Sequence, residues 1–226
     1  MIKKLLNLFF PEVCNACNNL LLDNEKDICT LCRHNLPVTN YHFNNSKLVE
    51  KIFYGRVKIE QATALLRFQK KGIVQQLLHN LKYRGHETIG EFLGAWLGSE
   101  LSTLSNYQSV DVIIPVPIHK RKLKTRGYNQ VAKFGIHIAK SLQAEYFDDV
   151  LLKTTSTKTQ VFKKRISRWN DDDSIFSIQN EDKIKDKHIL LVDDIITTGA
   201  TIEACINTLN KKRPHKISIA TMAIAE

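Results

Sequence analysis

From about residue 59 to the end of the chain, short apolar runs alternate with stretches in which apolar residues recur every three or four positions. The runs predict strands, and the helical spacing predicts helices. The predicted strands cover residues 59–68, 110–114, 150–152, 189–192 and 216–224, and the predicted helices cover residues 72–83, 89–101, 129–144 and 202–209. Strands that alternate with helices predict an α/β fold with a mostly parallel sheet covered by helices.

The N-terminal part of the chain lacks this alternation and is organised around cysteines. Residues 1–40 therefore form a separate small module in our interpretation, and residues 41–58, which are polar with interspersed aromatics, form a linker. The remaining chain, residues 59–226, is long enough to bury one α/β core.

The apolar run at residues 189–192 ends in polar groups that suit a ligand. Ile189 to Val192 has no polar alternation, which is typical of a central parallel strand. Asp193 and Asp194 follow, and then the loop T-T-G-A-T at 197–201. Carboxylates accept hydrogen bonds from vicinal hydroxyls, while the loop and the next helix N-terminus offer N–H groups to a phosphate. The whole segment predicts a site for a phosphorylated sugar, whereas a bare acid pair would better suit a solvated turn before an ordinary capped helix.

The four N-terminal cysteines are spaced as metal ligands. Cys14 and Cys17 form one C-x-x-C pair and Cys29 and Cys32 another, so the four thiolates can close a tetrahedral shell around zinc. Two disulfides or an iron–sulfur cluster are alternatives, and His34 could replace one sulfur. Disulfides need an oxidising compartment, and the first residues have no small-residue cleavage site, so we expect structural zinc in a cytoplasmic protein. A fully ligated ion leaves no open position for catalysis.

The composition indicates a partner or substrate that carries negative charge. The formal net charge of +10 favours polyanionic partners but also suits a phosphate-rich small substrate. No apolar segment is long enough to span a bilayer. The fifth cysteine, Cys205, is interpreted as a buried apolar residue.

Three further stretches could complete the site. Residues 115–130 follow a predicted strand and carry five cations that could receive pyrophosphate, or that could be a solvated basic loop. Residues 81–85, L-K-Y-R-G, end a helix at a C-cap glycine, where the two cations could simply complement the helix dipole. Residues 153–168 form a polar insertion that could be a lid.

These motifs stand in one order that resembles the ComF family over nearly the whole chain: a four-cysteine module, L-K-Y-R-G, P-V-P, R-G-Y-N-Q, T-x-x-Q, R-x-x-R-W and V-D-D-I-I-T-T-G-A-T. ComF proteins pair a zinc finger with a type I phosphoribosyltransferase domain, which is Rossmann-like, and are associated with natural competence. Two residues depart from the pattern: Lys153 stands where an arginine is usual, and Asp171 stands where an asparagine is usual.

The resemblance implies a phosphoribosyltransferase that binds phosphoribosyl pyrophosphate (PRPP) with magnesium. Asp193 and Asp194 are then the catalytic pair that holds the ribose. The implied PRPP contacts are Asp193, Asp194, Ile195, Thr197, Thr198, Gly199, Ala200 and Thr201. The pyrophosphate and lid candidates are Lys82, Pro117, His119, Arg121, Arg126, Gln130, Gln160 and Arg168.

The acceptor is not evident from the sequence. The resemblance implies incoming single-stranded DNA and a competence helicase as partners. A phosphoribosyltransferase of nucleotide metabolism is an alternative, but Thr197 stands where purine-salvage enzymes carry an acid, so the usual base for that reaction is missing. A second alternative is a non-catalytic single-stranded DNA binding protein that senses a phosphate or nucleotide, in which bases stack on Tyr128, Phe162 and Trp169.

Overall fold

The computed structural model describes residues 11–44, 46–154, 175–211, 213 and 215–225. Its centre is a five-stranded sheet in the order β1-β7-β6-β2-β3, with every neighbouring pair parallel. The strands are β1 (Ala62–Phe68), β2 (Val112–Pro115), β3 (Glu145–Tyr146), β6 (His188–Ile196) and β7 (Lys216–Ala225). The predicted α/β class is confirmed, and β6, the strand that carries Asp193 and Asp194, lies in the middle of the sheet.

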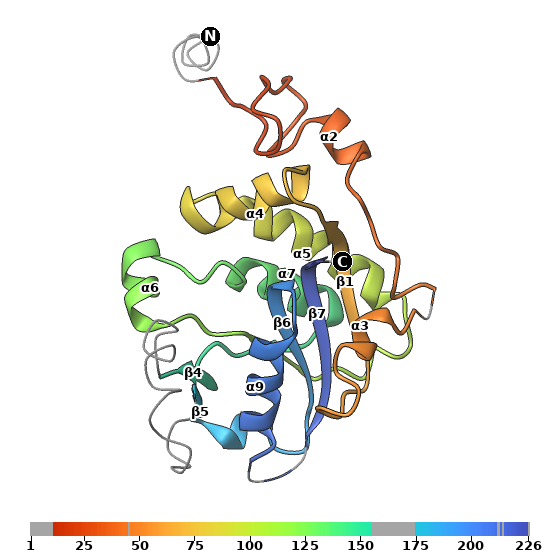
Figure 1. Cartoon of the computed structure of the whole chain (residues 1–226), viewed down its shortest axis with the longest axis vertical. Helices are drawn as coiled ribbons and strands as arrows, with labels where there is room; N and C mark the ends of the chain where they lie inside the picture. The colour runs from red at the N-terminus through yellow and green to blue at the C-terminus, as the bar shows by residue number, and fades with distance from the viewer. Residues whose placement is uncertain (1–10, 45, 155–174, 212, 214, 226) are drawn as a thin grey trace.

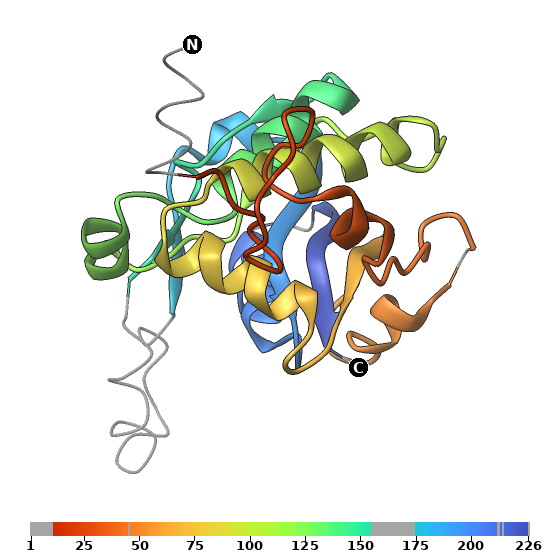
Figure 2. The ribbon, with the colours of Figure 1, turned by 90° about the horizontal axis from the view of Figure 1, so that it is seen from above.

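Helices cover both faces of this sheet (Figures 1 and 2). One face packs into a core with α4 (Ile73–Tyr83), α5 (Thr88–Ser102) and α7 (Ala132–Leu142). The other packs into a second core with α3 (Leu48–Lys51), α9 (Ala200–Leu209) and a two-stranded antiparallel sheet of β4 (Leu151–Lys153) and β5 (Phe176–Ile178). A short 3-10 helix, η1 (Glu181–Ile184), precedes β6. None of the helices in the described ranges is both long and apolar enough to cross a membrane.

The basic stretch after β2 differs from the solvated loop that the sequence allowed, because it contains α6 (Lys120–Arg126). His119 caps this helix by accepting the N–H of Arg121 on its Nδ1 atom at 3.1 Å. Gly127 ends it in the left-handed region, with φ 87°. None of its seven residues is buried, so apolar spacing could not reveal the helix.

The cysteine module packs against the large domain instead of standing apart from it. In Figures 1 and 2 it lies over α4 and α5. Its helix α2 (Thr30–His34) follows Cys29, and buried Cys14, Ile28 and Leu36 belong to the same apolar core as residues of α4 and α5. The module and the domain therefore share one core.

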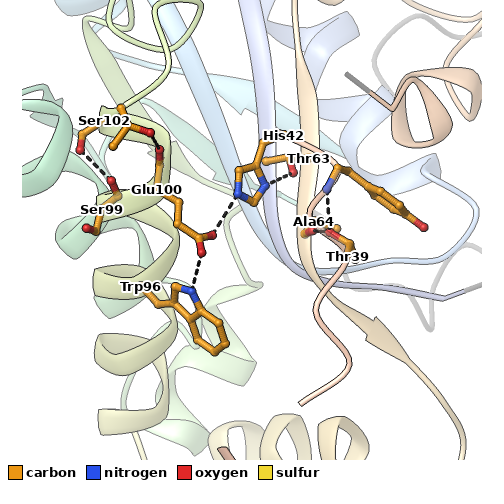
Figure 3. Close-up of polar contacts among 10 residues, drawn as sticks. Thr39, His42, Thr63, Ala64, Trp96, Ser99, Glu100 and Ser102 are labelled. Carbon is orange, nitrogen blue, oxygen red and sulfur yellow. Dashed lines mark hydrogen bonds and ion pairs between the residues drawn. The ribbon is translucent and has the colours of Figure 1, made fainter. Parts of the chain in front are cut away.

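Residues 37–42 fasten the module to the edge of the sheet. Val38 forms an antiparallel bridge with Leu66 of β1, and the main chain of Thr39 donates to Leu65 at 3.0 Å. His42 follows and is buried, as Figure 3 shows. Its Nδ1 lies 3.1 Å from the hydroxyl of Thr63, and its Nε2 lies 2.9 Å from a carboxylate oxygen of Glu100, whose other oxygen accepts the Trp96 indole N–H at 2.7 Å. This network joins the segment to β1 and α5.

Candidate functional site

The polar groups at the end of β6 lie at the carboxyl edge of the parallel sheet. The neighbouring strand β2 ends in register with β6, where Pro115 is opposite Val192. The main chain of Val116 then donates to the carbonyl of Val192 at 2.8 Å, so the basic segment that follows β2 leaves the sheet beside Asp193. The topology thus brings together the acid pair and the basic segment, as expected for an α/β ligand site.

The acid pair is buried, and both of its members accept hydrogen bonds from neighbouring groups. Asp194 is 4% exposed; one of its oxygens lies 3.0 Å from the ammonium of Lys82, and the other accepts the amide of Gln130 at 2.8 Å. Gln130 in turn accepts from the guanidinium of Arg126. Asp193 accepts the main-chain N–H of Asp194 at 2.8 Å. Residues of α4, of α6 and of the connection from α6 to α7 are therefore connected through one carboxylate.

Burial gives Asp193 unusual acid–base properties. Removal from water and the nearby charge of Asp194 raise its pKa to about 8, against the lowering effect of the N–H of Asp194 and the ammonium groups of Lys82 and Lys153. Lys153, at the end of β4, is half-buried, and this burial lowers the pKa of its ammonium group, while the charge of Asp193 raises it. A cation or hydroxyl donor that needs ionised Asp193 must displace its proton near neutral pH.

The T-T-G-A-T loop forms the turn from β6 into α9. Thr197, Thr198, Ala200 and Thr201 are exposed, while Gly199 is buried in the left-handed region with φ 74°. A Cβ atom at Gly199 would lie 2.9 Å from Ile52 and 2.9 Å from Phe53, so glycine is required both for its backbone angle and for close packing. The ten-residue α9 starts at Ala200, two residues before the predicted start, and its N-terminus faces this loop.

Arg56 holds the loop from the side of α3. Its guanidinium donates to the carbonyl of Thr198 at 2.8 Å and to that of Ile52 at 3.0 Å, and it also pairs with Glu203 of α9. The sequence did not single out Arg56, because it lies 142 residues from its partner in a segment without periodic pattern. No local signal could have identified it.

A basic pocket of about 370 Å³ lies next to the acid pair. This volume is typical of small-molecule sites. Four cations line it together with two tyrosines, and Lys82, which pairs with Asp194, is one of them. Arg126 stacks over the ring of Tyr83, with its guanidinium carbon 5.7 Å from the ring centre. The lining residues are Lys82, Tyr83, Gly85, Arg121, Lys122, Thr125, Arg126 and Tyr128.

The predicted pyrophosphate and lid residues separate into three groups. Lys82, Arg121, Arg126 and Gln130 lie in or directly beside the pocket. Pro117 lies in the connection from β2 to α6, and His119 acts as the helix cap described above. Gln160 and Arg168 lie outside the described residues, as do Phe162, Trp169 and Asp171.

The four cysteine sulfurs form a second candidate centre. They all lie within 4.8 Å of one another, and the sulfurs of Cys17 and Cys29 are 3.8 Å apart. A tetrahedral zinc with Zn–S bonds of about 2.3 Å requires sulfurs about 3.8 Å apart. The same separation is far longer than the roughly 2.05 Å of a disulfide, and all four cysteines are free thiols. Within the described part of the chain this is the one group of three or more His, Cys, Asp or Glu side chains that lie close enough to hold a metal, and His34 is not a member.

Main-chain N–H groups stabilise the thiolate form of Cys14. The N–H of Cys29 donates to the sulfur of Cys14 at 3.3 Å, and that of Ala16 at 3.4 Å. Burial alone would raise the pKa of the Cys14 thiol, yet these hydrogen bonds lower it to about 7. The donor set therefore fits a metal that prefers thiolates.

Comparisons with known proteins agree with this geometry. A family model described as a phosphoribosyl transferase domain matches residues 132–225, which include the T-T-G-A-T loop. The chain is 25% identical over 195 residues to the DNA utilization protein YhgH of Escherichia coli O157:H7, covering 84% of this chain and 80% of that protein. It is 24% identical over 207 residues to the competence protein ComFC of Bacillus subtilis, covering 89% and 79%. It is 27% identical over 116 residues to competence protein F of Haemophilus influenzae, covering 51% of each.

Proposed function

Since the chain belongs to the ComF family of proteins with a phosphoribosyltransferase domain, we propose that it binds PRPP with magnesium and handles incoming single-stranded DNA in natural competence. The observation that carries the proposal is the joining of an acid pair, a phosphate-type loop and a basic pocket at one sheet edge. This combination of groups suits a sugar that carries an anion at each end. The proposal places the protein in the cytoplasm, where thiolates remain reduced.

Each end of PRPP has its own binding groups in this proposal. The N–H groups and hydroxyls of the T-T-G-A-T loop bind the 5-phosphate at the N-terminus of α9. Asp193 and Asp194 accept the ribose hydroxyls and supply the oxygen ligands that magnesium prefers. Magnesium neutralises charge on the pyrophosphate when it is bound. The cations of the basic pocket, led by Lys82, receive the pyrophosphate as negative charge develops on it.

The DNA part of the proposal is supported by a second hollow, which is lined by residues of α4 and of the cysteine module. This hollow has a volume of about 420 Å³ and is lined by Lys71, His79 and Arg84 together with residues of the cysteine module. Tyr83, whose side chain is 71% exposed, lies one residue before Arg84, on the side of the first pocket. Exposed cations near an aromatic ring suit a phosphate backbone and stacked bases. A non-catalytic DNA binder with a sensing site would use the same groups.

The first test is titration of PRPP with magnesium into the wild type and Asp194→Asn. We expect the variant to bind at least about tenfold more weakly, because it loses a charged hydrogen-bond acceptor. Asp149→Asn is the matched control, since Asp149 is a surface acid paired with Lys183 at 2.5 Å. If the wild type does not bind PRPP, the proposal is wrong.

Pyrophosphate release then separates an enzyme from a sensor. Pyrophosphate release that depends on single-stranded DNA supports transfer of the phosphoribosyl group to the DNA or to a molecule bound to it. PRPP binding without release, combined with DNA affinity that falls steeply with salt, supports the sensing alternative. Turnover with a free base or amine would instead support an enzyme of nucleotide metabolism.

A further inference from the structure

The last turn of α4 is a junction between the cysteine module and the acid pair. Four consecutive residues of this turn each contact a different part of the molecule. The amide of Asn80 donates to the main-chain carbonyl of Asn15, between the first two cysteines, at 2.8 Å. The carbonyl of Leu81 accepts the hydroxyl of Tyr128. Lys82 pairs with Asp194, and Tyr83 stacks under Arg126.

The second pair of cysteines has an equivalent attachment on α5. Thr88, the first residue of α5, donates its hydroxyl to Asp27 at 2.5 Å, just before Cys29. The main chains of the two cysteine loops are themselves joined, since Asn15 donates to the carbonyl of Asp27 at 2.8 Å. Each cysteine loop thus bonds one side of the α4–α5 connection, residues 84–87. Gly85 of this connection, with Lys82 and Tyr83 just before it, lines the basic pocket.

The burial of Asn80 shows that its attachment is specific. Asn80 is 2% exposed within an otherwise apolar helix face that includes Leu77, Leu78 and Leu81. Its side-chain oxygen also accepts the amide of Gln76 at 3.3 Å. A buried amide in such a face costs free energy unless its hydrogen bonds are made, so the module must stay in register with α4.

We propose that Asn80, with Thr88 as its counterpart on α5, is a positioning residue through which the four-cysteine module holds Lys82 and the pocket wall against Asp194. The module then acts on anion binding without touching the anion. The attachments at Asn80 and Thr88 together define the orientation of the α4–α5 connection, while residues 37–42 anchor the module to β1 (Figure 3). The choice of pyrophosphate as the anion rests on the proposed function.

The test compares two anions in the metal-loaded, full-length protein. Pyrophosphate and ribose 5-phosphate, each with magnesium, are titrated into the wild type, Asn80→Leu and Thr88→Val. We expect pyrophosphate affinity to fall about threefold to tenfold, the range of one or two hydrogen bonds, while ribose 5-phosphate affinity stays the same. A purely structural role would weaken both anions together. Thr103→Val is the matched control, because the hydroxyl of Thr103, at the other end of α5, donates only locally to the main-chain carbonyl of Glu100 and does not reach the cysteine module.

Hydrogen–deuterium exchange tests the positioning directly and needs no ligand. We expect faster exchange in residues 82–88 in both variants, and in the wild type after chelation of its metal below the melting temperature. Unchanged exchange there, or unchanged pyrophosphate affinity in both variants, would overturn the inference. If the wild type binds neither anion while exchange responds as expected, the proposed function fails and the positioning role stands. If Asn80→Leu does not fold, Thr88→Val and the chelated wild type decide.

Discussion

Asp193 and Asp194 are adjacent acids that the fold buries together. Asp194 pairs with the ammonium of Lys82 and accepts the amide of Gln130, whereas Asp193 accepts the main-chain N–H of Asp194. The two carboxylates therefore have different partners, although the residues are adjacent in the sequence. The difference arises because α4 and the connection from α6 to α7 supply Lys82 and Gln130 as partners of Asp194.

Asp193→Asn should change how stability depends on pH. The folded state raises the pKa of Asp193 from 3.8 to about 8 through burial and the charge of Asp194. Between these values the folded state keeps a proton that the unfolded chain releases, so this residue lowers the free energy of unfolding as pH rises. Asp193→Asn has no such titrating group. We therefore expect its free energy of unfolding in denaturant, relative to that of the wild type, to increase from about pH 4 to pH 8 and then to level off.

Asp149→Asn should show the opposite trend. The hydrogen bond from Lys183 lowers the pKa of Asp149, so ionised Asp149 stabilises the folded state once the pH exceeds its unfolded pKa. Removal of this carboxylate should lower the free energy of unfolding at neutral pH and leave it unchanged at low pH.

If the free energy of unfolding of the wild type and of Asp193→Asn depended on pH in the same way, the raised pKa of Asp193 would be contradicted.

At the scale of elements, the turn from β6 into α9 depends on contacts with α3 and the residues after it. Ile52 and Phe53 leave no room beside Gly199, and Arg56 bonds Thr198 and Glu203. The helix N-terminus is thereby held in place for an anion. The segment that the sequence treated as a linker, residues 41–58, supplies these contacts and contains buried Val49 and Phe53.

Gly199→Ala should destabilise the protein more than Gly127→Ala. Both glycines have positive φ, which costs alanine about 1 to 2 kcal/mol. Only at Gly199 would the new methyl group also meet other residues, since nothing lies within 4 Å at Gly127. Urea unfolding of the two variants measures the difference, and ribose 5-phosphate affinity should fall only for Gly199→Ala. Equal losses of stability would argue against the close packing at this turn.

At the scale of the whole molecule, the cysteine module is part of the main core. Cys14, Cys29 and Cys32 are buried together with apolar residues of α4 and α5. A small segment with little core of its own depends on such packing and on its metal. Loss of the metal should therefore destabilise the phosphoribosyltransferase domain as well as the module.

Metal removal should lower the melting temperature of the whole chain. We expect one zinc per chain by mass spectrometry, and a decrease of more than about 5 °C on chelation in a single transition, because one core is shared. Cys29→Ser should not retain the metal, whereas Cys205→Ser should retain it, since Cys205 is buried in α9 and is not one of the four clustered cysteines. Visible absorbance would indicate an iron–sulfur cluster, and an unchanged main transition would show that the module is independent.

The sequence alone determined the local features of this protein. The apolar run of β6, the amphipathic α4 and α7 and the paired cysteines each depend on residues close together in the chain, so periodicity and spacing reveal them. The acid pair and the T-T-G-A-T loop follow from the same local pattern. Their position at the carboxyl edge of a parallel sheet was predictable because that topology follows from alternating strands and helices.

Only the tertiary structure decided which distant groups meet. The contacts of Lys82 and Gln130 with Asp194, of Arg56 with Thr198 and of Asn80 with Asn15 join segments 64 to 142 residues apart. An exposed helix such as α6 also escaped prediction, because it buries no residue and so has no apolar period. Local pattern records how a segment is buried, whereas the partner of a polar side chain depends on how the packed elements are arranged in space.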